Sequence, residues 1–244
     1  MSRATGQRRV AFSTHSLWSS VYINWYNKAQ CPPPHVLGER LDHSAPYPLT
    51  IKAILTQFHS YGNSSFSTSA SLRLIPILFS QSQRWEDVEF VSSQLDTVPI
   101  DDQPFPMLRS LRLETEKEAD RWIHFTEENA PHLSKVFLQL IQPTTFSPLE
   151  TAAVLPYAQL THYHGPAYRE ENTKCVLALM PDLQYGDLEY NPYHVEGTLP
   201  ISENILPSLS RLHIRGGRIE LHQVLWLRYS NTSSHLMKKR MPFP

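Results

Sequence analysis

Two histidines, His162 and His164, have the spacing that could most directly support chemistry. Side chains two apart in a strand point to the same face, so both imidazoles could bind one metal ion. A protein zinc site needs three or four ligands, and the neighbouring sequence offers no third candidate. We therefore expect two exposed histidines on one strand face, with no metal site.

Catalytic arrangements are equally weak. Cys175 could serve as a nucleophile with a distant histidine, but its apolar, helix-like surroundings are typical of a core cysteine. The acidic pairs Glu127-Glu128 and Glu170-Glu171 are typical of solvated helix or loop charges. The chain has no nucleophile elbow, phosphate loop, dinucleotide fingerprint or zinc-protease motif. The sequence thus predicts a protein that is not an enzyme and has no cofactor. An enzyme built on an irregular α/β domain is the competing class.

Composition limits the partners and the compartment. The 244 residues carry 22 Lys and Arg against 23 Asp and Glu, whereas nucleic-acid-binding domains are usually basic. Two cysteines are too few for a disulfide framework, and the first ten residues contain no apolar signal segment. The longest apolar runs are far shorter than a membrane span. We expect no nucleic-acid partner, no membrane association and a cytoplasmic or nuclear location.

A repeat organises the second half of the chain. Five segments begin with an apolar residue and a proline, and the prolines are 25, 25, 25 and 26 residues apart: Pro106, Pro131, Pro156, Pro181 and Pro207. Leucine stands two residues after each proline except at Ala158. The fifth position holds Leu111, Val136, Thr161, Gly186 and Leu212, and the seventh holds Leu113, Leu138, Tyr163, Leu188 and Ile214. A weaker copy precedes them in Trp85, Val88 and Phe90.

The fifth and seventh positions alternate as the buried side of a strand does, and the leucine at the second position packs where the chain enters that strand. Each proline stops whatever helix comes before it. A repeat of this length and leucine spacing is in the leucine-rich-repeat range. The sequence therefore predicts an α/β fold, an irregular leucine-rich-repeat solenoid with a curved parallel sheet and helices on its outer face.

The return segments are expected to be partly helical. Ser147 to Glu150 forms a capping box, and Glu116 to Asn129 has apolar residues at helical spacing. Thr173 can cap a helix that carries Val176, Leu177 and Met180. Ile219 to Tyr229 is predicted to be a last helix, and Asn191 to Asn204 is predicted to be mostly loop.

The positions that alternate with the buried ones should face the concave side of such a sheet. They are the fourth, sixth and eighth after each proline: Ser110, Arg112, Glu114, Lys135, Phe137, Gln139, Leu160, His162, His164, Tyr185, Asp187, Glu189, Arg211, His213 and Arg215. Tyrosine and arginine are frequent anchors at protein interfaces. We expect a protein ligand to contact Arg112, Lys135, Phe137, His162, Tyr185, Asp187, Arg211 and His213, although a merely solvated face is the alternative.

The stretch Arg8 to Ile23, "RRVAFSTHSLWSSVYI", resembles the segment just after the F-box in a large family of mushroom-type fungal proteins. Similar motifs follow in the family's order, at 48–51, 82–88, 105–113 and 155–161. The resemblance implies an F-box-like module followed by irregular leucine-rich repeats, and a role as substrate receptor of a cullin-based ubiquitin ligase. The leucine-proline-rich helix pair that opens the family's F-box has no counterpart before Arg8.

The sequence accordingly divides into residues 1–39, a remnant of the F-box-like helical module with a linker, residues 40–230, the leucine-rich-repeat domain, and residues 231–244, a C-terminal tail. The expected function is a protein–protein interaction scaffold that resembles the substrate-recognition part of an F-box receptor. With an incomplete F-box, binding of the cullin-ligase adaptor is not expected. A structural interaction protein without any ubiquitin-ligase link is the alternative.

Overall fold

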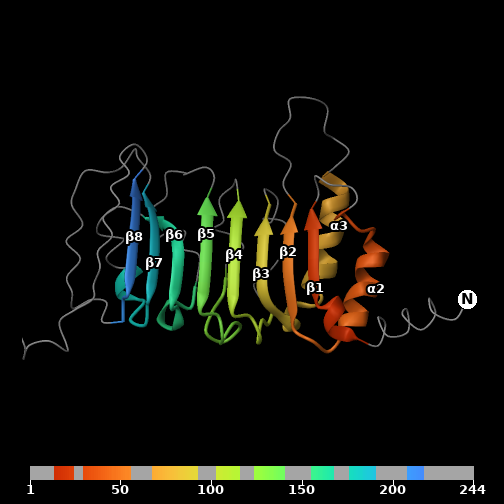
Figure 1. Cartoon of the computed structure of the whole chain (residues 1–244), viewed down its shortest axis with the longest axis horizontal. Coiled ribbons are helices and arrows are strands. Elements are labelled where there is room, and N and C mark those ends of the chain that lie inside the picture. The colour runs from red at the N-terminus through yellow and green to blue at the C-terminus, as the bar shows by residue number, and fades with distance from the viewer. Residues whose placement is uncertain are drawn as a thin grey trace, which may run out of the picture.

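A computed structural model of the chain describes residues 14–24, 30–55, 68–92, 103–115, 124–140, 155–167, 176–190 and 208–216, and the structural account concerns these residues. In this part of the chain eight strands form one sheet (Figure 1). The strands are β1 (Ser20–Asn24), β2 (Leu49–Ile54), β3 (Trp85–Val91), β4 (Ser110–Thr115), β5 (Lys135–Leu140), β6 (His162–Ala167), β7 (Tyr185–Tyr190) and β8 (Arg211–Gly216).

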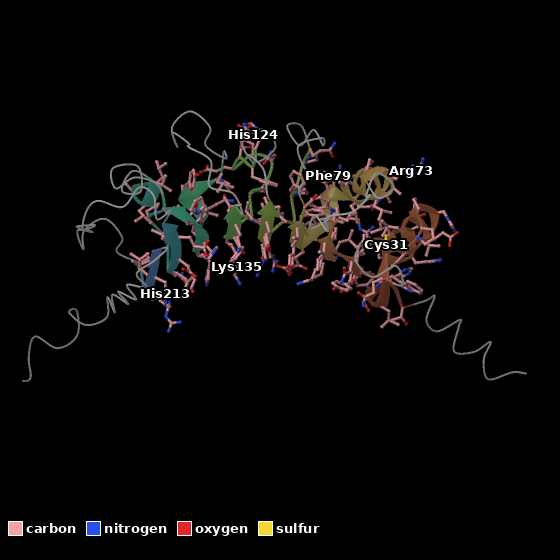
Figure 2. The ribbon with its side chains drawn as sticks, turned by 90° about the horizontal axis from the view of Figure 1, so that it is seen from above. Cys31, Arg73, Phe79, His124, Lys135 and His213 are labelled. Atoms are coloured by element: carbon pink, nitrogen blue, oxygen red, sulfur yellow. The ribbon has the colours of Figure 1, made fainter. Side chains whose placement is uncertain are left out.

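The strands follow one another across the sheet in chain order, and every neighbouring pair is parallel. Figure 2 shows that the sheet bends into an arch, with the strands along its inner side. The prediction of an α/β fold with a curved parallel sheet is therefore confirmed. The sheet begins with β1, within the segment 1–39, and β1 pairs with β2 along its whole length.

Helices cover the outer side of the sheet near its N-terminal end. They are α2 (Pro34–Ser44) and α3 (Thr68–Phe79), which pack beside β1 to β3 (Figures 1 and 2). Proline suits the first turn of α2 because the N–H it lacks would have no partner inside the helix. Short 3₁₀ turns occur at η1 (His15–Trp18), η3 (Ser82–Arg84) and η6 (Tyr157–Gln159).

The predicted helix from Glu116 to Asn129 is wrong for its described part, residues 124–129, which form a bridge and a turn. The side chains of Thr126 and Asn129 close this turn, because each accepts a hydrogen bond from the other's backbone N–H, at 3.2 and 2.8 Å. The Asn129 amide also donates to the His124 carbonyl at 2.9 Å. Such side-chain bonds compete with helix formation. Phe125 is still buried, so the apolar residue expected on a helix packs into the core from a turn.

Of the other predicted returns, residues 176–178 are helical as expected. The capping box from Ser147 to Glu150, the loop from Asn191 to Asn204 and the last helix from Ile219 to Tyr229 lie outside the described residues, as do Cys175 and the acidic pair Glu170-Glu171.

The core is a ladder of apolar side chains on the outer side of the sheet. One rung position holds Val21, Ile51, Val88, Leu111, Val136, Tyr163, Gly186 and Leu212, which are paired strand by strand. Another row, where the chain enters the strands, consists of Leu108, Leu133, Leu160, Leu183 and Leu209, none of them more than 4% exposed. Because each buried leucine contributes about 1.5–3 kcal/mol, these rows dominate the stability of the sheet.

The third proline-marked unit departs from the predicted register. Leu160, expected on the concave face, is fully buried and takes the place of Leu133, whereas Ala158 is exposed. Thr161 and Tyr163, expected at the fifth and seventh positions, are displaced likewise, since Tyr163 pairs with Val136. The cause is η6, which places two more residues between proline and strand than the other units have.

A glycine compensates for this shift on the core side. Gly165 follows two residues after Tyr163 and pairs with Leu188 of β7. A Cβ atom at Gly165 would lie 2.5 Å from the Tyr163 hydroxyl oxygen and 2.6 Å from the ring carbon that carries it. The tyrosine ring therefore occupies the space that a leucine fills in the neighbouring strands.

Candidate ligand-binding face

The inner side of the arch carries the side chains that alternate with the core. In Figure 2, Lys135 and His213 point into the arch, on the side opposite His124, Phe79 and Arg73. The eight predicted contact residues all lie at these positions, on β4 to β8. We call this side the concave face.

Strand register arranges the concave face in rows that run across the strands. The N-terminal row is Ser20, Thr50, Asp87, Ser110, Lys135, His162, Tyr185 and Arg211. The middle row is Tyr22, Lys52, Glu89, Arg112, Phe137, His164, Asp187 and His213. Beyond it, towards the strand C-termini, lie Glu114, Gln139, Pro166 and Glu189.

Near the N-terminal end of the sheet, the middle row contains two ion pairs that share Glu89. The Lys52 ammonium contacts both carboxylate oxygens of Glu89, at 2.8 and 2.9 Å. Glu89 also lies 3.7 Å from the Arg112 guanidinium on the next strand. These side chains are partly exposed, so each pair adds little stability, but together they fix the direction of Arg112.

A stacked cluster continues the row. The Arg112 guanidinium carbon lies 4.0 Å from the centre of the Phe137 ring. The other face of that ring is covered by His164, with ring centres 3.8 Å apart and planes inclined by only 2°. A cation on one face and an imidazole on the other hold Phe137 in place. Phe137, predicted as a ligand anchor, therefore offers a ligand its edge and not its faces.

The cluster ends in a buried polar pair. His164 Nδ1 lies 3.1 Å from a carboxylate oxygen of Asp187, and both residues are buried, at 7% and 3% exposure. His164 Nε2 faces Glu189, at 3.7 Å. Burying a carboxylate is costly unless a donor faces it, and His164 supplies that donor. Asp187, predicted to contact a ligand, is thus buried and in contact with His164.

The N-terminal row has a different character over β5 to β8. The Thr161 hydroxyl donates to the Ser134 carbonyl oxygen at 3.1 Å and lies 3.0 Å from His162 Nδ1. The His162 ring stacks against Tyr185 at 6.0 Å, and Tyr185 lies 5.9 Å from the His213 ring. Burial and the neighbouring Lys135 ammonium lower the pKa of His162 below its usual value.

The two histidines were predicted to be exposed and not to form a metal site, and the predicted exposure is wrong for His164, which is 7% exposed because it stacks on Phe137 and contacts Asp187. His162 and His164 share the concave face, but His162 bonds Thr161 whereas His164 faces Asp187. Among the residues that the structure describes, no three histidine, cysteine or acidic side chains gather as metal ligands would.

Sequence reasoning underrated three residues of this face. His164 lay among the predicted concave positions but not among the predicted contacts, and it is the centre of the stacked cluster. Lys52 and Glu89 lie on strands without a proline marker. Their signal was the alternation of apolar and polar residues in 49–54 and 87–90, which resembles the repeat.

Comparisons with protein-family models, with curated proteins and with solved structures gave no match to the chain. Within the described ranges, the helices are too short or too polar to cross a bilayer.

Proposed function

We propose that the chain is a leucine-rich-repeat protein that recognises a protein ligand on its concave face. The observation that supports this most is the order of that face: register aligns charged and aromatic side chains in rows across parallel strands. A sheet whose other side is a packed core holds these side chains at fixed spacing. Preorganised contacts of this kind reduce the entropy cost of binding.

The individual anchors fit the chemistry of protein interfaces. Arg112 and Tyr185 belong to the residue types that carry most binding energy, and Arg211 is exposed. His164 is paired with Asp187 and stacked on Phe137, so its imidazole supports an aromatic side chain of the face. This use of the imidazole favours recognition over the competing enzyme hypothesis.

A ubiquitin-ligase link is the narrower form of the proposal. Its support is the resemblance of Arg8 to Ile23 and the ordered motifs after it to the fungal F-box-like family. In this form the concave face would select the substrate of the ligase. Co-purification of the cullin-ligase adaptor with the chain would favour this form, and its absence would favour an interaction protein without that link.

The test of the main proposal is a quantitative pull-down from a fungal lysate. A triple variant with Arg112, Tyr185 and Arg211 changed to alanine should lose the proteins that the wild type retains. In a control triple variant, Arg73, His132 and Leu179 are changed to alanine. These three residues are exposed but lie outside the concave rows. If both variants retained the same proteins as the wild type, the concave face would not be the binding surface.

A further inference from the structure

The charge of the side chains in the N-terminal row changes sign along the sheet. On β3 it carries Asp87, but from β5 to β8 it carries Lys135, His162, Tyr185 and Arg211, without an acidic side chain. Lys135 and Arg211 are exposed. We call these four residues the basic row.

Two acidic side chains of β7 near the basic row, Asp187 and Glu189, contact His164. Asp187 is buried against His164, and Glu189 faces the same imidazole from the far end of β7. Glu114 and Glu189 belong to the positions nearest the strand C-termini. Over β5 to β8 that C-terminal row pairs Glu189 with the basic position Arg215, whereas the basic row has no acidic position.

We propose that the basic row binds an extended acidic segment of the protein ligand, which runs across the strands. This inference rests on the proposed function and names the chemistry of the partner. Carboxylates would meet the Lys135 ammonium and the Arg211 guanidinium, and the backbone between them would cross the stacked rings of His162 and Tyr185.

Spacing supports an extended segment. Neighbouring strands lie about 4.8 Å apart, so Lys135 and Arg211, separated by three strand intervals, are about 14 Å apart along the row. An extended chain advances about 3.4 Å per residue, so side chains four residues apart span about the same distance. Acidic residues at positions i and i+4 would therefore reach both cations.

His162 couples this binding to a proton. Its Nδ1 lies 3.0 Å from the Thr161 hydroxyl oxygen, so Nε2 is the ring nitrogen that a ligand carboxylate would meet. The charged or titratable groups at neighbouring positions are Lys135 on β5, His164 on β6, and Tyr185 and Asp187 on β7. A bound carboxylate would offset the Lys135 charge and favour the protonated imidazole. Binding should therefore take up a proton and strengthen as the pH falls through the pKa of His162.

The test uses the full chain with a fluorescein-labelled poly-L-glutamate peptide as the probe, measured by fluorescence anisotropy. We expect saturable binding that weakens as salt is added. Lys135→Gln and Arg211→Gln should each weaken it roughly threefold to fivefold, the effect of one exposed charge contact. Lys135→Arg should preserve it. Arg73→Gln, which removes the same charge from an exposed site on α3, should leave it unchanged.

A second readout separates a defined site from general attraction. In an NMR titration, saturating poly-L-glutamate should move the His162 midpoint to higher pH, whereas a neutral poly-glutamine peptide should not. Equal weakening by Arg73→Gln, an unmoved His162 midpoint, or binding of a phosphoserine peptide but not of poly-L-glutamate would each overturn the inference. If poly-L-glutamate failed while the pull-down still depended on the concave face, the proposed function would survive and the acidic partner would not.

Discussion

Replacing Gly165 tests how the third unit of the sheet is packed. Gly165 is the register partner of Leu188 in β7, so Gly165→Leu would place a leucine at the same position in β6. The Cβ atom of the new leucine would overlap the Tyr163 ring. That ring is 2% exposed, so it is almost entirely enclosed by other atoms of the chain. Overpacking of this kind costs about 1–3 kcal/mol, and leucine adds more atoms than a single methyl. We expect a loss at the upper end of that range.

The matched changes are Tyr163→Val and the double variant. Tyr163→Val alone removes most of a buried ring and should cost about 2–4 kcal/mol through the cavity that it leaves. Combining it with Gly165→Leu reproduces the valine and leucine of β5, Val136 and Leu138. The leucine then fills the space that the ring left. The double variant should therefore be more stable than either single variant, with a coupling energy of about 2 kcal/mol or more.

Urea unfolding of the four proteins, followed by circular dichroism, measures these differences. The slope of the free energy against urea should stay constant, so that shifts in the midpoint report stability. Additive losses in the double variant would show that the Tyr163 ring does not lie over Gly165, and the account of the shifted unit would fail.

Three further outcomes follow from the packing and the charges. Leu160→Ala should destabilise the chain by about 2–5 kcal/mol whereas Ala158→Ser should cost little, and equal urea midpoints would contradict the shifted register. Arg84, which donates hydrogen bonds to the Tyr47 carbonyl at 2.9 and 3.1 Å and to the Leu41 carbonyl at 3.2 Å, should cost about 2 kcal/mol when changed to alanine, with thermal unfolding as the measurement. Because the pKa of His162 is lowered in the folded chain, stability should be full above about pH 6.5 and decline as the pH falls through the folded pKa, and a His162→Gln variant should lack that part of the decline.

The sequence predicted the part of the fold that periodicity encodes. Proline and leucine at constant spacing located β4, β5, β7 and β8, and alternation within each strand separated core from surface. It could not predict the turn at Thr126 and Asn129, because an apolar residue at helical spacing is buried equally well by a turn that side chains close. The strands β1 and β2 lack the proline signal, so their place in the sheet was not predicted.

The sequence predicted which residues lie on the concave face, but not which of them contact one another. Alternation placed Arg112, Phe137 and Asp187 on the concave face, but sequence spacing does not say which neighbours touch across strands. Side-chain contacts between successive strands from β4 to β7 cover Phe137 on both sides and bury Asp187 against His164. Those contacts depend on register, and the proline-based register was wrong by two residues in β6.

The same displacement shows why the rows of the concave face survive irregular repeats. From Lys135 to His162 the chain advances 27 residues, and from His162 to Tyr185 only 23, yet the three are register partners. The extra residues are absorbed in η6, before the strand begins, and the return to β7 is shorter by the same number. On the core side the shift required a tyrosine over a glycine, whereas on the concave side His162 stays level with Lys135 and Tyr185. Repeat length can therefore vary in the turns without moving the side chains of the basic row, because parallel pairing and not chain distance sets their positions.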